Sequence, residues 1–250
     1  MPIKAILFDL DDTLIDWSGF KGNWWELEPI HLRHVYNYIR SEVHPLEVNS
    51  EGFVEEFSRR SREGWNVARD SLISPHLGKL LIETAQALGV PDHHLDHDRF
   101  LTEYRWNVAE GTVVFPEVPK VLEKLRSHGF ELGIITNSFV PMQLRDIELE
   151  AHGLLKFFPR CRLSAADAGY LKPHPEVFRV ALNTLRVTVK ETIFVGDSLP
   201  ADIVGAQSIG MRAVWRKPKS VNGANRDVQV TPDAQIRSLE ELMGIIALWM

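Results

Sequence analysis

Carboxylates gather near the start of this chain, directly after a short apolar run. The segment FDLDDTLID, Phe8 to Asp16, contains four aspartates in nine residues. Asp9 and Asp11 are two positions apart, so their side chains lie on one side of the chain if the backbone stays extended. Two carboxylates at one place can divide the work of nucleophile and proton carrier between them. Asp9 and Asp11 are therefore the first candidate catalytic pair, whereas Asp12 and Asp16 are predicted to be turn or hinge residues.

Polar residues follow three later apolar runs in the same way. They are Thr136, Asn137 and Ser138 after ELGII, Lys172 in GYLKPHPEVF, and Asp197 and Asp202 in GDSLPAD. Carboxylates that converge on one place repel each other unless a cation shares the site. Oxygen ligands suit Mg²⁺, which is usually bound by one or two carboxylates and by water. Asp9 and Asp197 are the best candidates for direct metal ligands.

These residue types together suit the transfer of a phosphoryl group. A metal-held carboxylate that faces phosphorus can act as a nucleophile and divide one displacement into two steps through an aspartyl-phosphate. Asp11 can protonate the departing alkoxide in the first step and activate water in the second. Thr136 and the backbone amides of Asn137 and Ser138, expected at the start of a helix, offer donors to the phosphate oxygens. Lys172 adds a positive charge near the transferring group.

The apolar runs themselves are typical of strands buried on both faces of a parallel sheet. Strands are predicted at 3–8, 131–136, 161–164, 191–196 and 211–215, and helices at 118–128, 141–152, 175–185 and 200–208. A last helix is expected at 238–249, where Ser238 and Glu241 have the spacing of a capping box. Alternating strands and helices predict an α/β fold with a doubly wound parallel sheet, in which ligands bind at the carboxyl ends of the strands.

Residues 17–109 have a different pattern, without runs rich in valine and isoleucine. Four helical stretches are predicted there, at 24–43, 50–69, 75–88 and 95–108, and the first has apolar residues at helical spacing. We therefore predict an inserted all-helical cap domain at 17–109 and a Rossmann-like catalytic core formed by 1–16 and 110–250. The polar segment 216–227 is predicted to be a loop.

Two features of this insert have both a functional and a plain structural interpretation. Five residues at its start could face the active site and select the substrate, or the tryptophans could simply pack the cap against the core: Trp17, Phe20, Lys21, Trp24 and Trp25. The tract DHHLDHD, residues 92–98, has histidines at the spacing of zinc ligands. A solvated helix start is the preferred interpretation of this tract, because short histidine-rich tracts match by composition alone.

Composition excludes several classes of protein. The 250 residues carry a formal net charge of −6, so no basic surface for nucleic acid is expected. The single cysteine, Cys161, cannot form an intramolecular disulfide, and no signal peptide or membrane span is predicted. These features predict a cytoplasmic enzyme, either a monomer or a homodimer, that contacts neither membrane nor nucleic acid.

The candidate residues, in this order, resemble the haloacid dehalogenase-like (HAD) hydrolase superfamily, in the branch with a helical cap after the first strand. The matching motifs are DLDDTL from Asp9, IITN to Asn137, YLKPHPEVF from Tyr170 and GDSLPADIVGA from Gly196. The resemblance implies that Asp9 is the nucleophile and that Asp11 is the general acid and base, with its backbone carbonyl on Mg²⁺. It further implies that Thr136 and Lys172 bind phosphate, that Asp197 and Asp202 belong to the metal site, and that Thr13 supports the loop.

One position departs from the pattern of these relatives. Many of them have asparagine just before the second aspartate of the fourth motif, where this chain has Ala201. The difference removes no catalytic carboxylate, but a hydrogen bond beside the metal ligands is expected to be missing.

The predicted function is a Mg²⁺-dependent phosphatase that acts on a small phosphorylated metabolite. A metal-independent 2-haloacid dehalogenase is an alternative, but the dehalogenases of this superfamily generally lack the second aspartate, because a halide leaves without a proton. A phosphomutase or a phosphonatase on the same scaffold is a further alternative, and a phosphonatase would need a cap lysine, for which only Lys21 and Lys79 are available. The alternative of another class is a binding or regulatory protein without turnover.

Overall fold

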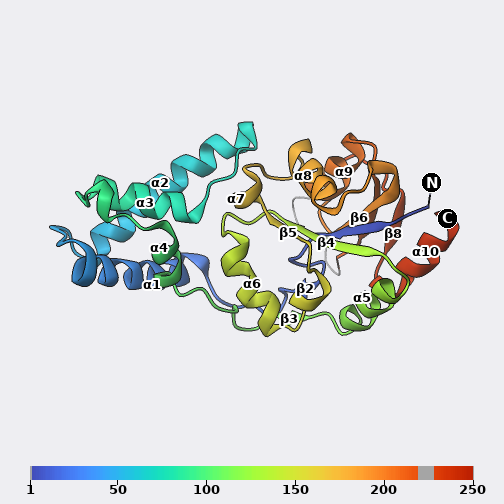
Figure 1. Cartoon of the computed structure of the whole chain (residues 1–250), viewed down its shortest axis with the longest axis horizontal. Coiled ribbons are helices and arrows are strands. Elements are labelled where there is room, and N and C mark those ends of the chain that lie inside the picture. The colour runs from blue at the N-terminus through green and yellow to red at the C-terminus, as the bar shows by residue number, and fades with distance from the viewer. Residues whose placement is uncertain (1, 219–227, 250) are drawn as a thin grey trace.

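A six-stranded parallel sheet forms the centre of the protein in a computed structural model that describes residues 2–218 and 228–249 (Figure 1). The strand order is β5-β4-β1-β6-β7-β8, and every neighbouring pair in this sheet is parallel. The strands are β1 (Ala5–Phe8), β4 (Glu131–Thr136), β5 (Cys161–Ser164), β6 (Thr192–Gly196), β7 (Arg212–Arg216) and β8 (Ala234–Ile236). The predicted parallel sheet is confirmed, and β8 is a further strand that the sequence analysis did not predict.

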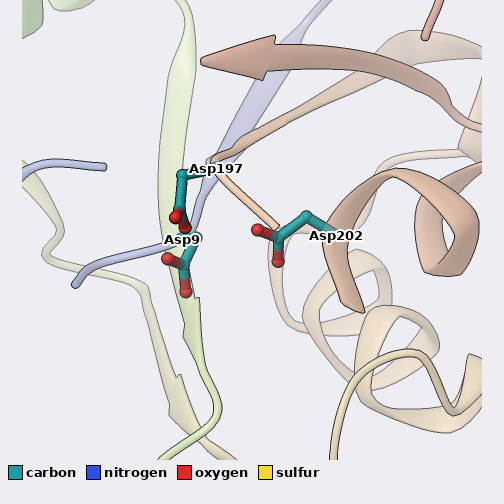
Figure 2. A group of neighbouring side chains, drawn as sticks. All are labelled: Asp9, Asp197 and Asp202. Carbon is teal, nitrogen blue, oxygen red and sulfur yellow. The ribbon is translucent and has the colours of Figure 1, made fainter. Parts of the chain in front are cut away.

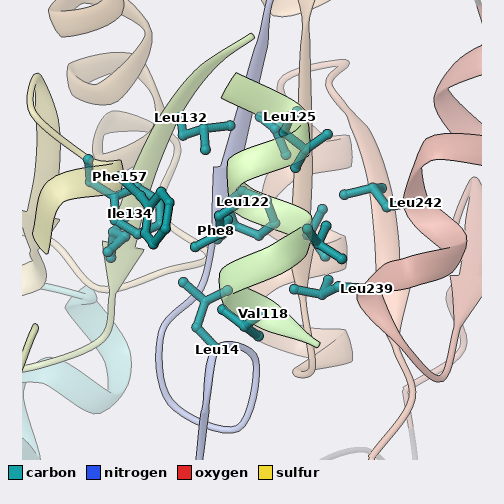
Figure 3. Packing of buried hydrophobic residues seen from close by; sticks show 14 of the residues in the cluster. Phe8, Leu14, Val118, Leu122, Leu125, Leu132, Ile134, Phe157, Leu239 and Leu242 are labelled. Atoms are coloured by element: carbon teal, nitrogen blue, oxygen red, sulfur yellow. The ribbon is translucent and has the colours of Figure 1, made fainter. Parts of the chain in front are cut away.

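Helices cover both faces of this sheet because both faces are apolar. Ile6 and Phe8 of β1 belong to the hydrophobic cluster on one face, whereas Ala5 and Leu7 belong to the cluster on the other. Figure 3 shows the first face, where α5 (Val118–Ser127) and α10 (Leu242–Trp249) pack on the sheet. The same cluster includes residues of α6 (Met142–Ala151). The second face is covered by α8 (Pro175–Leu185) and α9 (Val204–Ser208). The predicted doubly wound architecture is confirmed.

Four helices lie beside the sheet, at the left of Figure 1, and bury a hydrophobic cluster of their own. They are α1 (Trp24–Tyr38), α2 (Ser50–Ser71), α3 (Leu77–Ala87) and α4 (His97–Glu103). A π-helical turn at Ile39–Val43 continues α1. The side chains of Asn23, Asn49, His76 and Asp96 accept hydrogen bonds from the first backbone amides of the four helices. Val140 and Leu144 also join this cluster, so the exact domain boundary stays a prediction.

The structure differs from the sequence prediction at several element ends. The fourth helix, expected at 95–108, ends at Glu103, because Arg105 has a φ of 53° and leaves the helical conformation. The four helices α1–α4 are called the helical layer below. The chain crosses between this layer and the sheet on an antiparallel pair of strands that was not predicted, β2 (Ile15–Asp16) with β3 (Val113–Val114). Arg216, expected in a loop, is the last residue of β7, and 219–227 of that predicted loop lie outside the described residues.

Near the carboxyl terminus the capping box at Ser238 and Glu241 is present, on a 3₁₀ turn (Leu239–Glu241) that precedes α10. Among the residues described, no helix combines the length and the apolar character that a membrane span requires.

Gly133 of β4 lies where two neighbouring strands approach closely. A Cβ at this position would meet Leu7 Cδ2 at 2.7 Å and Cys161 Cβ at 3.1 Å, and both of these residues are buried. Gly133→Ala is therefore expected to lower the free energy of unfolding by about 1–3 kcal/mol, through overpacking. Urea denaturation measures this change.

Gly244→Ala in α10 is the matched control, because a Cβ there would point into open space. This variant is expected to be about as stable as the wild type, or more stable by up to about 1 kcal/mol. A Gly133→Ala variant that is as stable as the wild type would contradict the packing described for β4.

Candidate active site

The candidate residues meet at the carboxyl edge of the three central strands. Asp9 directly follows β1, Thr136 is the last residue of β4, and Asp197 directly follows β6. The backbone amide of Asp9 donates to Val195 O at 2.9 Å, which holds the end of β1 against β6. Residues more than a hundred positions apart therefore converge because their strands are parallel neighbours, as expected for a ligand site in an open α/β sheet.

Lys172 lies at the centre of this group. Its Nζ is 2.6 Å from Asp9 Oδ1 and 2.7 Å from Asp202 Oδ1, and it donates to the carbonyl oxygen of Ile135 at 2.9 Å. Burial alone would lower the pKa of Lys172, but the two carboxylates outweigh burial and raise it above its usual range. Lys172 is therefore a buried, permanently charged ammonium group that fixes two of the candidate carboxylates.

Three buried carboxylates face one another at this point (Figure 2). One oxygen each of Asp9, Asp197 and Asp202 lies within 4.8 Å of the others. Burial raises the pKa of Asp9 to about 7, although the positive charge of Lys172 offsets part of this rise. Burial and the charge of Asp9 raise the pKa of Asp197 to about 8. The raised pKa values mean that ionising Asp9 and Asp197 costs free energy even with the Lys172 ammonium group beside them.

This donor set fits a Mg²⁺ ion. All three groups offer hard oxygen ligands, and Lys172 pairs directly with two of them, Asp9 and Asp202. A divalent cation lowers the cost of ionising such a cluster, and Mg²⁺ accepts carboxylate oxygens together with water. The residues present are therefore compatible with the metal that the sequence analysis predicts.

Asp202 is held in place by the short turn that follows β6. Its Oδ2 accepts a hydrogen bond from the amide of Ser198 at 2.9 Å, and the Ser198 hydroxyl accepts from the amide of Ala201 at 3.3 Å. Gly196 has no side chain because a Cβ there would lie 2.3 Å from Asp202 Oδ2. The motif GDSLPAD thus has a steric reason for its glycine as well as a chemical reason for its aspartates.

The carboxylate of Asp11 is held by three donors rather than by Lys172. Trp17 Nε1 donates to Oδ1 at 2.8 Å, Thr136 Oγ1 donates to Oδ2 at 3.3 Å, and Arg145 Nη2 lies 2.6 Å from Oδ1. Arg145 is itself buried, with its Nε 3.0 Å from Glu148 Oε2. The sequence analysis missed Arg145 and Glu148. Their only signal in the sequence is an arginine followed three residues later by a glutamate in a predicted helix, and this spacing does not reveal that the pair is buried.

The loop after β4 differs from the predicted arrangement. Helix α6 begins at Met142, so Asn137 and Ser138 lie in the preceding loop and not at the start of the helix. The Asn137 side chain is engaged with the backbone of Lys172: its Nδ2 donates to Lys172 O at 3.0 Å, and its Oδ1 accepts from Lys172 N at 2.7 Å. Asn137 therefore links the second and third motifs through its side chain.

The other aspartates of the first motif have local roles. Asp12 has a φ of 58° and accepts a hydrogen bond from the amide of Trp17, and Asp16 accepts from the amide of Ser18. Asp12 is a turn residue, as predicted, whereas Asp16 is the last residue of the short strand β2. Thr13 is buried with its hydroxyl 3.4 Å from Asp9 Oδ2, and its carbonyl accepts from Arg216 at 2.7 Å. These contacts agree with the expected supporting role of Thr13.

A cavity of about 410 Å³ lies between this edge of the sheet and the helical layer. Asp11 and Arg145 form its polar end, and Glu28 lies in its wall. Most of the remaining lining is aromatic: Trp17, Trp24, Tyr104, Trp106 and Phe139. The junction residues Trp17 and Trp24 thus reach the cavity, whereas Trp25 is 75% exposed and neither Lys21 nor Lys79 belongs to the lining.

The histidine-rich tract does not bring three potential metal ligands together in the part of the chain that the structure describes. Only Asp9, Asp197 and Asp202 meet there as a group of potential metal ligands. The tract forms a short 3₁₀ turn, Asp92–His94, and the exposed start of α4. The interpretation as a solvated helix start is the one that fits.

Comparison with known proteins agrees with this geometry. A family model described as haloacid dehalogenase-like hydrolase matches residues 3–210. The glyceraldehyde 3-phosphate phosphatase of Pyrococcus abyssi is 31% identical, over 98% of this chain and 94% of its own length.

Two solved structures extend this similarity to the fold. A HAD phosphatase from Thermococcus onnurineus matches with a TM-score of 0.57 and 27% identity, over 98% of both chains. A 2-haloacid dehalogenase from Pseudomonas syringae pv. Tomato matches with a TM-score of 0.62 and 27% identity, over 99% of this chain and 100% of the other. The chain is thus similar over nearly its full length to enzymes with either of two activities.

The raised pKa values predict how stability depends on pH when no divalent cation is bound. Below about pH 4 the folded and unfolded states both carry protonated Asp9 and Asp197. As pH rises toward 7–8, the unfolded state releases these protons while the folded state keeps them, so the free energy of unfolding falls. The full loss is reached above about pH 8, where both groups are ionised in the folded state as well.

Asp197→Asn removes one of the two groups, so in EDTA the variant should gain stability over the wild type as pH rises from 5 to 8. Added Mg²⁺ should stabilise the wild type more at pH 8 than at pH 5. Thermal unfolding measures both effects, and Asp70→Asn, at an exposed carboxylate, is the control. A constant difference between Asp197→Asn and the wild type across this pH range would refute the charge repulsion described here.

Proposed function

The chain belongs to the haloacid dehalogenase-like hydrolase family, and from this we propose that it is a Mg²⁺-dependent phosphatase that hydrolyses a small phosphorylated metabolite through an aspartyl-phosphate. The observation that carries the proposal is the pairing of Asp9, beside Lys172 and the acidic cluster, with a second carboxylate, Asp11, at the polar end of the cavity. A phosphatase of this kind needs one carboxylate as the nucleophile and a second one as the proton carrier.

In the first step, Asp9 attacks phosphorus and the bond to the ester oxygen breaks. The bond that forms joins an Asp9 carboxylate oxygen to phosphorus, which gives the aspartyl-phosphate. Asp11 donates a proton to the departing alkoxide, because an alkoxide is too basic to leave unprotonated. Trp17, Thr136 and Arg145 hold the Asp11 carboxylate in one orientation, which supports a role as a positioned proton carrier.

In the second step, water attacks the phosphorus of the aspartyl-phosphate. Asp11, now ionised, accepts a proton from this water, and Asp9 leaves as a carboxylate together with inorganic phosphate. The Lys172 ammonium group stays beside Asp9 throughout and stabilises the charge that develops on the phosphoryl oxygens. Thr136 and the loop amides at Asn137 and Ser138 are the proposed donors to those oxygens.

Asp9, Asp197 and Asp202 are the proposed ligands of Mg²⁺, with the Asp11 backbone carbonyl as a further ligand. When bound, the ion neutralises the charge of the cluster and draws electron density from the phosphoryl group. Asp202 is in addition held by Lys172 and by the Ser198 amide, which fixes its orientation toward the other two carboxylates.

Dehalogenation is the second candidate, because a solved 2-haloacid dehalogenase matches the fold at 27% identity. That reaction also uses a nucleophilic aspartate, but a halide leaves without a proton and the reaction needs no metal. The buried acidic cluster and the oriented Asp11 favour phosphate ester hydrolysis. A halide-release assay with 2-chloropropionate, in the absence of metal, distinguishes the two activities.

Asp9→Asn is expected to lower kcat for p-nitrophenyl phosphate by at least about a thousandfold, because the amide cannot form the covalent intermediate. Removal of Mg²⁺ with EDTA should lower the wild-type rate to a similar level, and Mg²⁺ should restore it. Steady-state release of p-nitrophenolate measures both effects.

Asp16→Asn is the matched control, since it neutralises another carboxylate of the same segment and an amide oxygen can still accept from Ser18. This variant should keep most of the wild-type activity. Substantial turnover by Asp9→Asn, or halide release together with no phosphate release, would refute the proposed function.

A further inference from the structure

The cavity beside Asp11 has a wall that is largely aromatic. Trp17, Trp24, Tyr104 and Trp106 present aromatic surface to it. Several of these rings pack on one another: Trp24 and Trp106 are stacked with centroids 5.6 Å apart, and Trp17 and Trp24 lie 6.0 Å apart. The rings thus form one continuous aromatic wall that joins the first motif to the helical layer.

Glu28 lies in the same wall, on α1. Among the residues that the structure describes, its carboxylate has no ion-pair partner, and burial alone raises its pKa to about 7. A carboxylate placed in an aromatic wall without a cation loses hydration and gains nothing in exchange. A positively charged ligand in the cavity would offset this cost.

The other charged groups of the cavity do not offset Glu28. Asp11 and Asp12 also line it, and Arg145 is the one cation in the described lining. Arg145 is already engaged, by Asp11 at 2.6 Å and by Glu148 at 3.0 Å. The cavity therefore keeps a net negative charge at the end that is formed by the helical layer.

The ring geometry excludes a nucleobase sandwiched between Trp24 and Trp106. A planar base sandwiched between two rings needs about 7 Å between them, because stacked carbon atoms lie about 3.5 Å apart. Trp24 and Trp106 are nearly parallel, at 3°, but their centroids are only 5.6 Å apart, so no third ring fits between them. A compact ammonium group needs only an exposed ring face within about 6 Å and a nearby carboxylate.

We propose that the leaving group carries a positively charged ammonium group, so that the substrate is the phosphate monoester of an amino alcohol. This inference rests on the proposed phosphatase function and names the substrate class of that site. The ester oxygen lies at the Asp11 end of the cavity, and the ammonium group lies against the aromatic wall beside Glu28. The cavity of about 410 Å³ is within the size range of small-ligand sites.

The experiment compares two esters of the same shape and different charge. Phosphocholine carries a quaternary ammonium group, and 3,3-dimethylbutyl phosphate has a carbon atom in place of that nitrogen. The wild type should hydrolyse phosphocholine with a kcat/KM at least about tenfold higher, through cation–π contacts and the Glu28 charge. Phosphoethanolamine should also be preferred over its neutral analogue.

Glu28→Gln keeps the size of the side chain and removes its charge, so this preference should fall to about twofold or less. Glu26→Gln is the matched control, because it neutralises an exposed carboxylate on the same helix outside the cavity lining, and it should keep the preference. Both rates come from one preparation of each variant, so any loss of folded protein cancels in their ratio.

A second measurement needs only the wild type: choline should inhibit the hydrolysis of p-nitrophenyl phosphate competitively, and 3,3-dimethylbutanol should inhibit it much less. Equal kcat/KM for the two esters, a preference that survives in Glu28→Gln, or faster hydrolysis of glyceraldehyde 3-phosphate or a nucleoside monophosphate overturns this inference. These outcomes leave the proposed function intact, whereas the absence of hydrolysis of every phosphate ester, p-nitrophenyl phosphate included, would refute that function as well.

Discussion

Electrostatic repulsion among three buried carboxylates is the constraint on which the rest of this structure depends. Asp9, Asp197 and Asp202 face one another in a buried place beside Lys172, and burial together with their mutual repulsion raises the pKa values of Asp9 and Asp197. A fold tolerates such a cluster only if its backbone is held firmly by other interactions. The same repulsion prepares the site for a divalent cation, because binding the ion relieves it.

The sheet provides that support. Strands β1, β4 and β6 are buried on both faces and adjacent, so the residues that follow them cannot move apart without disrupting the core. The position of the Asp11 side chain depends less on the sheet. It is held by Trp17, which lies between the first strand and the helical layer, and by Arg145 of α6. The proton carrier and the aromatic wall are thus connected through Trp17, which links the chemistry at phosphorus to the choice of leaving group.

Much of the sheet and the main acidic residues could be predicted from the sequence because each is signalled locally. A short apolar run followed by a polar residue marks both a buried strand and the place where its carboxyl end meets a ligand. Strand β8 was missed because its sequence AQI is short and only partly apolar. Arg145 and Glu28 were missed because their importance arises from tertiary placement: each lies on a helix among ordinary charged residues and becomes significant only beside Asp11 or in the aromatic wall.

The most direct test of the central claim is to observe the phosphoryl group on Asp9. In Asp11→Asn the activation of water is lost, but p-nitrophenolate can still leave without a proton, so the first step should outrun the second. We expect a burst of about one p-nitrophenolate per active site in the presence of Mg²⁺. After acid quenching, mass spectrometry should find a phosphoryl group on the peptide that contains Asp9. Steady release without a burst or adduct, or an adduct on another residue, would contradict the assignment of Asp9 as the nucleophile.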